Sequence, residues 1–152
     1  MTRTLTTLLA VIVLACAALT AAKSLQLKDL PAATQKTVQD NLKGGEIKNI
    51  AKETEKGVVQ YEVESILNGQ RRDFNVDTKG NLIVMEEETS IDSIPAAAKA
   101  TIMKKVGAGT LGLVETFTKG GGGETMYEAA WKDKAGKKHE VLVKADGTEA
   151  KD

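Results

Sequence analysis

Apolar residues recur every four positions in segment 94–106, which is the period of an amphipathic helix. The stripe consists of Ile94, Ala98, Ile102 and Val106. Pro95 fits a first helical turn, where its missing N–H would have no partner in any case. Gly107 supplies a stop at the C-terminal end. A second, less regular stripe predicts another helix from about residue 30 to residue 42.

After each predicted helix the period changes to two, which is typical of half-buried β-strands. In one such run the apolar residues are Val59, Tyr61 and Val63, and the polar residues between and after them are Gln60, Glu62 and Glu64. Asn68-Gly69 predicts a two-residue hairpin turn, because both positions need positive φ. In the later run Tyr127, Ala129 and Trp131 share a face. Further strands are predicted near residues 46–54 and 111–118.

Three landmarks occur twice in the same order, at spacings of 64, 66 and 67 residues. They are Pro31 and Pro95, Tyr61 and Tyr127, and Gly80 and Gly147. We therefore predict an α+β fold built as a tandem repeat. Each unit consists of a helix plus a three- or four-stranded antiparallel sheet, and the helices pack on one face of the sheet. The units are 23–88 and 89–152, with the acidic stretch 86–92 as the linker. One unit alone buries a thin core, so joined sheets or packed helices would explain the doubling.

The first 22 residues differ from the rest of the chain. A short basic start precedes an apolar run at 8–14, and no acidic residue occurs before Asp29. This pattern indicates a secretory signal peptide over residues 1–22, with Thr20 and Ala22 at the small-residue positions before the cleavage site. We expect a periplasmic or secreted protein of the bacterial cell envelope.

Cys16 leaves an alternative open. Residues 13–16 resemble a lipobox, so lipidation of Cys16 would give a membrane-anchored lipoprotein instead. The residues after Cys16 are apolar rather than polar, which favours ordinary cleavage after Ala22. In either case the remaining chain offers no disulfide or thiolate metal site, since Cys16 is the single cysteine.

Composition and motifs give no catalytic, metal or cofactor site. Lys+Arg and Asp+Glu both number 21, so no general field attracts nucleic acid. His139 is the only histidine and lacks a partner set, so we interpret it as ordinary strand surface. The run 120–123 lacks the Lys-Ser/Thr of a phosphate loop and predicts a flexible hairpin loop. Residues 77–81 lack the regular acidic ligands of a calcium loop and predict a turn.

The sheet face opposite the helices meets solvent or a partner. By alternation, the predicted partner-binding face carries Gln60, Glu62, Glu64, Glu128 and Lys132. On the other face Tyr61, Tyr127 and Trp131 are expected to pack under the helices. If they are exposed instead, they form the alternative partner-binding face.

Three short charged runs are interpreted without a functional role. Arg71-Arg72 and Lys137-Lys138 follow the two hairpin turns at equivalent places, and we interpret them as exposed pairs that keep the hairpins soluble. The run 86–88 consists of three glutamates and is interpreted as solvated linker rather than an acid/base pair, because consecutive strand residues point to opposite faces.

The repeated order of these motifs resembles the PepSY-like family. In the first copy the motifs are Leu30-Pro31, Tyr61-Glu62-Val63, Phe74-Asn75-Val76-Asp77 and Gly80; in the second they are Ile94-Pro95, Tyr127-Glu128, Val141-Leu142-Val143 and Asp146-Gly147. The resemblance implies an exported bacterial module with the fold of the beta-lactamase inhibitory protein (BLIP), in which helices lie behind a curved antiparallel sheet. It implies binding or inhibition of proteins and supplies no catalytic residues.

The sequence therefore predicts a non-enzymatic exported binding module of PepSY-like type. Its expected partner is a protein or peptide of the cell envelope, such as an exported hydrolase. We expect no cofactor and no nucleic acid, and membrane contact only through a lipidated Cys16. The alternative is a small-ligand or metal-responsive periplasmic binding protein.

Overall fold

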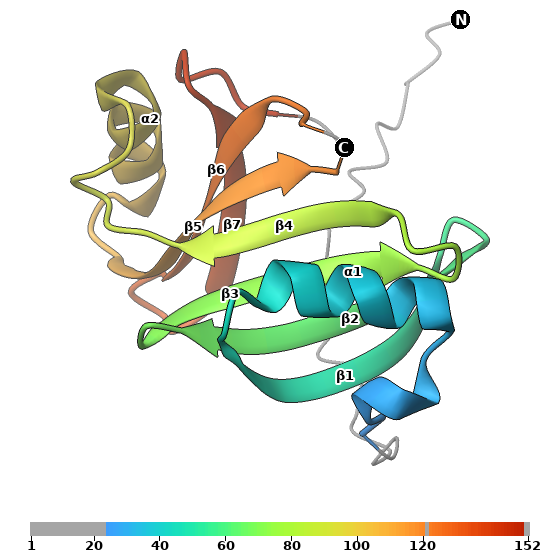
Figure 1. Ribbon diagram of the computed structural model, residues 1–152. Helices are drawn as coiled ribbons and strands as arrows, with labels where there is room; N and C mark the ends of the chain where they lie inside the picture. The colour runs from blue at the N-terminus through green and yellow to red at the C-terminus, as the bar shows by residue number, and fades with distance from the viewer. Residues whose placement is uncertain (1–23, 121, 151–152) are drawn as a thin grey trace, which may run out of the picture.

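The computed structural model describes residues 24–120 and 122–150. Within them, seven antiparallel strands form one sheet in the order of the sequence, and two α-helices pack on it (Figure 1). Along the chain the elements are η1 (Leu27–Asp29), α1 (Ala32–Leu42), β1 (Glu46–Glu55), β2 (Val58–Leu67), β3 (Gln70–Asp77), β4 (Leu82–Glu88), α2 (Ala96–Val106), β5 (Thr110–Lys119), β6 (Thr125–Lys132) and β7 (Lys138–Lys144). The α+β class is confirmed. The proposed signal peptide and Cys16 lie outside the described residues.

Both helices begin one residue after a proline. Pro31 and Pro95 cap α1 and α2 with φ of −55° and −54°, so each proline precedes the first turn rather than lying in it. The residues before them, Leu30 and Ile94, were predicted to open the helical stripe. They are extended or loop residues whose side chains are nevertheless buried, at 4% and 7% exposure.

Apolar side chains form one cluster under each helix. The first cluster joins α1 to β1–β4 and consists of Leu30, Val38, Ile50, Tyr61, Val63, Phe74, Val76 and Met85. The second joins α2 to β5–β7 and consists of Ile94, Ala98, Ile102, Val106, Val114, Ala129 and Val143. Strand residues of both clusters point to the same face of the sheet, as the registers from β2 to β7 require.

The acidic run 86–88 is not the linker that the sequence predicted. It ends β4, and it pairs with β5 through Glu86 opposite Phe117 and Glu88 opposite Glu115. This pairing makes the sheet continuous from β1 to β7. The prediction failed because charge was taken as a sign of solvated loop, although the period-two alternation of a strand places only every second glutamate on a given face. The connection to α2 begins after Glu88.

The predicted hairpins are present. Asn68 and Gly69 both have positive φ, 54° and 85°, as the turn between β2 and β3 requires. Gly120, which was predicted to be part of a flexible loop, instead donates its N–H to the carbonyl of Ile83 at 2.7 Å. A side chain at Gly120 would collide with the backbone of Leu82, so this glycine lets β5 approach β4 closely.

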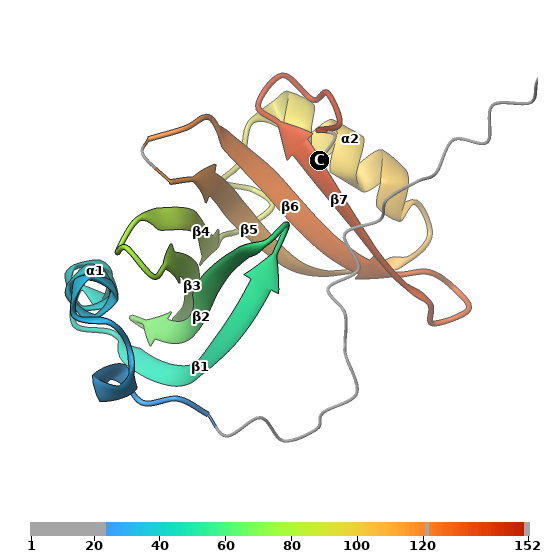
Figure 2. The same cartoon turned by 90° about the vertical axis from the view of Figure 1, so that its right-hand side faces the viewer.

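The sheet bends between its two halves. Figures 1 and 2 show α1 and α2 on the outer side of the bend, well apart from each other. We call the sheet face under the helices the covered face and the opposite one, on the inner side of the bend, the open face. The open face includes Glu62, Glu86, Glu115 and Glu128, according to the strand registers.

Candidate binding surface

The residues predicted to bind a partner lie on the open face. Gln60, Glu62 and Glu64 alternate with the covered residues of β2, and Glu128 and Lys132 alternate with those of β6. Lys132 is exposed at the end of its strand, whereas Glu62, Glu64 and Glu128 are half-buried. The structure therefore brings the two predicted groups onto one continuous surface.

Gln60 differs from the prediction of a solvent-facing polar side chain. It is only 3% exposed, and its Nε2 donates to Glu55 Oε2 at 3.2 Å. Asp73 is also a polar residue of this face that is buried, at 5% exposure. The bend explains the difference, because side chains on the inner side of a curved sheet cover one another even though no helix lies over them.

Carboxylates crowd the middle of the open face. Burial raises the pKa of Glu86 to about 8, and the charges of Glu128 and Glu115 add to this effect. Burial also raises the pKa of Glu62 to about 7, with a further contribution from Glu53. The carboxyl groups of Glu62 and Glu86 therefore hold their protons to unusually high pH.

Glu115 is at the centre of this cluster. Burial raises the pKa of its carboxyl, and the positive charge of Arg71 opposes that rise. Its Oε1 is buried and accepts no hydrogen bond from the described residues. A buried carboxylate oxygen without a donor is costly, so this atom could accept a hydrogen bond from a bound molecule.

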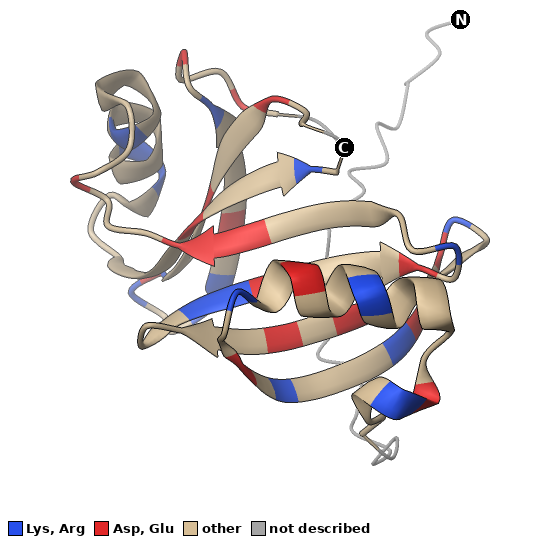
Figure 3. Cartoon of the chain, viewed as in Figure 1, with Lys and Arg blue, Asp and Glu red and all other residues tan. Residues whose placement is uncertain are grey.

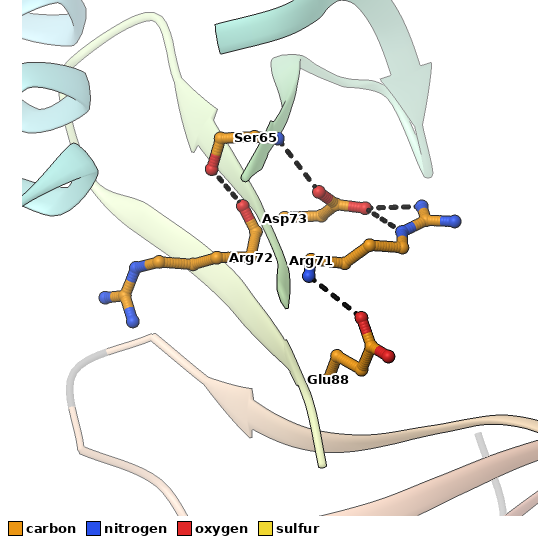
Figure 4. Close-up of polar contacts among 5 residues, drawn as sticks. All are labelled: Ser65, Arg71, Arg72, Asp73 and Glu88. Carbon is orange, nitrogen blue, oxygen red and sulfur yellow. Dashed lines mark hydrogen bonds and ion pairs between the residues drawn. The ribbon is translucent and has the colours of Figure 1, made fainter. Parts of the chain in front are cut away.

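Arg71 and Asp73 form an ion pair beside the cluster (Figure 4). The Nε and Nη2 of Arg71 donate to Asp73 Oδ2 at 3.2 and 2.5 Å. The other carboxylate oxygen, Asp73 Oδ1, accepts the backbone N–H of Ser65 at 3.0 Å. The N–H of Arg71 itself donates to Glu88 Oε2 at 3.0 Å. Asp73 is thus fully engaged, which is why its carboxylate can be buried.

Arg72 is not the exposed residue that the sequence predicted. It is 6% exposed, its Nε donates to the carbonyl of Asn41 at 3.0 Å, and its Nη1 forms an ion pair with Glu87. Arg72 therefore fastens the C-terminal end of α1 to β4 on the covered side. Lys137 and Lys138, in contrast, are exposed at the second hairpin.

The aromatic residues lie on the covered face. Tyr61 is 7% exposed in the first cluster, and Tyr127 and Trp131 pack against the second. His139 is half-buried beside them, stacks on Trp131 with ring centroids 5.3 Å apart, and its Nε2 lies 2.8 Å from Asp133 Oδ2. The alternative face is therefore occupied by the helices and their cluster residues.

A shallow hollow of about 250 Å³ lies at the margin of the open face. It is lined in part by Lys119, Met126, Leu142 and Lys144. In residues 24–120 and 122–150 no group of three or more histidine, cysteine, aspartate or glutamate side chains is arranged to hold a metal ion. None of the helices in these ranges is long and apolar enough to cross a membrane.

Sequence reasoning missed Glu86, Asp73 and Glu115. Glu86 was assigned to a linker, and the other two had no motif. The available signal was the run 82–88, since its apolar first half already predicted a strand that could continue into the glutamates. What the sequence could not give is the strand order that places these three carboxylates side by side.

The sequence matches no family model and no curated protein. Its fold, however, is similar to solved structures from Bacteroides. A candidate periplasmic protein from B. eggerthii matches with a TM-score of 0.64 and 14% identity over 80% of this chain and 86% of that chain. A DUF2874 family protein from B. uniformis matches with a TM-score of 0.64 and 13% identity over the same shares. A BLIP-like protein from B. fragilis matches with a TM-score of 0.53 and 21% identity over 76% of this chain and 82% of that chain. At these identities the likeness shows the fold alone, and that fold is BLIP-like.

Proposed function

We propose that this protein is a non-enzymatic binding module of the cell envelope that docks a protein or peptide on its open face. The observation that carries the proposal is the bent seven-stranded sheet with helices on its outer side only. None of the helices among the described residues lies over its inner side, which carries half-buried polar side chains. The BLIP-like character of one structural neighbour supports a role in protein binding.

Of the predicted residues, the proposed site comprises Glu62, Glu64, Glu128 and Lys132, and we add Glu86 and Glu115 to it. All lie on the open face. Gln60 is too deeply buried to touch a partner and serves to hold the edge of β1 through Glu55. The surface is polar with few aromatics, which suits a transient complex better than an obligate interface.

We further propose an internal duplication of PepSY-like type, with units 23–88 and 89–152. One contact occurs at equivalent places in both halves and supports it. Thr37 Oγ1 donates to the carbonyl of Gly80 at 2.7 Å, and Thr101 Oγ1 donates to the carbonyl of Gly147 at 2.8 Å. In each case a helix threonine fastens the turn that follows a strand of the same unit.

Export is proposed from residues 1–22, and the candidate periplasmic neighbour is in keeping with it. Intact-mass analysis of envelope material tests this part. A mature chain that begins at Lys23 supports the signal peptide. A diacylated chain that begins at Cys16 shows a membrane-anchored lipoprotein instead.

The docking site is tested by capture from a native envelope extract. The baits are the mature protein, Ala130→Trp on the open face and the control Ala100→Trp on the exposed side of α2. A protein retained by the first and third baits and lost from the second supports the proposal, because uncharged bulk blocks the open face alone. A partner retained equally by all three contradicts the site, and the absence of any retained protein contradicts the binding function.

A further inference from the structure

The open face carries like charges opposite one another on neighbouring strands. Asp73 faces Glu86 across β3 and β4, and Glu115 faces both Glu88 and Glu128. Directly opposed like charges destabilise a sheet. The sheet therefore bears a cost at these three pairs wherever both carboxyl groups are ionised.

On the open face, the cations among the described residues are fewer than the carboxylates and lie mostly toward its margins. The charges that act on Glu62 and Glu86 come from Glu53 on β1, Glu64 on β2, Asp73 on β3, Glu115 on β5 and Glu128 on β6. Arg71 on β3 and Glu88 on β4 lie on the same face. Arg71 is committed to Asp73. Lys119 and Lys144 lie nearer the margin, where Lys144 pairs with Glu124 at 3.0 Å. Figure 3 shows the acidic end of β4 at the point where the sheet bends.

From this arrangement we propose that the partner presents an extended cationic segment, in which arginine or lysine side chains reach the carboxylates of Glu62, Glu86 and Glu115. The inference deepens the proposed function and rests on it. A guanidinium there replaces like-charge repulsion by charge-assisted hydrogen bonds, as Arg71 already does for Asp73. It also supplies a donor to the buried Oε1 of Glu115.

Apolar residues lie between the carboxylates and indicate which side chains the segment carries between its basic residues. Phe117 lies opposite Glu86 and Met126, and Val84 lies opposite Lys119. Met126 is only 7% exposed, whereas Phe117 and Val84 are half-buried. A segment that combines basic with small or apolar residues can therefore satisfy the charges and cover the remaining apolar surface.

Binding of a cation must be linked to the ionisation of the carboxylates. The pKa of Glu62 is raised to about 7 and that of Glu86 to about 8, so both are largely protonated at about pH 6. A positive ligand favours their ionised forms. Its affinity must rise from about pH 6 to about pH 9, and arginine stays charged throughout this range.

The probe is a fluorescent peptide of about ten residues that alternates arginine with alanine, the length of one long strand. Anisotropy titrations use the mature protein, the double variant Glu62→Gln/Glu86→Gln and the control Asp40→Asn/Glu149→Gln. The control removes the same charge outside the open face, where Asp40 pairs with Lys36 and Glu149 with Lys105. Circular dichroism verifies that all three are folded.

At about pH 9, where Glu62 and Glu86 are ionised, we expect saturable binding that is about tenfold weaker in the open-face variant and unchanged in the control. The affinity rises with pH in the mature protein and the control, and it rises less in the open-face variant, which retains only Glu115 of the three carboxylates. An otherwise identical peptide with glutamate in place of arginine does not bind.

Equal affinity for the open-face variant and the control overturns the inference, and so does the absence of binding by the arginine peptide. These outcomes are separable from the proposed function. A further outcome is an envelope protein that is lost from the Ala130→Trp bait but retained equally by the mature protein and by Glu62→Gln/Glu86→Gln. In that case the open face is a docking site, and its partner is not recognised through positive charge.

Discussion

The two faces of the sheet are built by the same strands and differ in what lies over them. On the covered face Phe74 and Val76 are almost completely excluded from water beneath α1, and Ile102 of α2 is equally buried over the other half. On the open face, β4 and β5 carry Glu86 and Glu115, whose pKa values are raised by burial. The covered face therefore contributes stability through apolar burial, whereas on the open face burial disfavours the ionised carboxylates.

The largest expected effect compares two phenylalanines on opposite faces. Phe74 is 1% exposed, so Phe74→Ala should lower the free energy of unfolding by about 3–5 kcal/mol. Phe117 is half-buried on the open face, and Phe117→Ala should cost about 1–2 kcal/mol. Urea unfolding measures both. Equal losses would show that the open face contributes to the core as much as the covered face does.

The second prediction concerns the pH dependence of stability. Glu86 has a pKa of about 8 in the folded protein against 4.5 ordinarily, so the fold favours its protonated form. Its contribution is fully present below about pH 4.5 and is lost as the pH rises through about 8. After a discount for solvent screening, we expect Glu86→Gln to stabilise the protein at pH 8 by about 2 kcal/mol relative to the unsubstituted chain.

The control for Glu86→Gln is Glu124→Gln, whose carboxylate pairs with Lys144 near the margin and is exposed. This change should leave the difference in stability between about pH 5 and pH 8 unaltered. Chemical unfolding at both pH values gives the comparison. A Glu86→Gln protein with the same pH dependence as the unsubstituted chain would show that the open face does not strain the fold.

A third prediction compares two glycines that share a backbone conformation. Gly147 and Gly136 have φ of +86° and +81°, but a Cβ at Gly147 would lie 2.8 Å from the carbonyl oxygen of Ala97, whereas one at Gly136 meets open space. Gly136→Ala should cost about 1 kcal/mol for the backbone alone. Gly147→Ala should cost about 1 kcal/mol more, because α2 must move. Thermal unfolding distinguishes the two.

The covered face could be predicted from the sequence to a large extent. Helices, hairpins and the placement of Tyr61 under α1 followed from periods of four and two and from Asn68-Gly69. These features are local, because each depends on residues a few positions apart. Even the misplaced starts of the helices, which follow Pro31 and Pro95, lay within two residues.

The open face could be predicted only in outline. Alternation placed Glu62 and Glu128 on one face, but it could not show that Glu86 and Glu115 lie between them. That arrangement requires β4 to pair with β5 across the presumed linker, a contact between segments separated by α2. The burial of Gln60 follows from the bend of the sheet, which no local pattern reports.

The smallest expected effect on stability is at Lys132, the exposed lysine at the end of the open face. Lys132→Glu should change the free energy of unfolding by less than about 0.5 kcal/mol, because an exposed side chain loses little on substitution. If positive charge is what the open face recognises, the same change should strengthen binding of the arginine peptide by about twofold at low salt, and the gain should vanish as salt screens the added charge. Anisotropy at two salt concentrations provides the measurement, with Lys36→Glu on the outer side of α1 as the matched control. A loss of affinity for the arginine peptide in Lys132→Glu would show that the negative charge of the open face is not the basis of recognition.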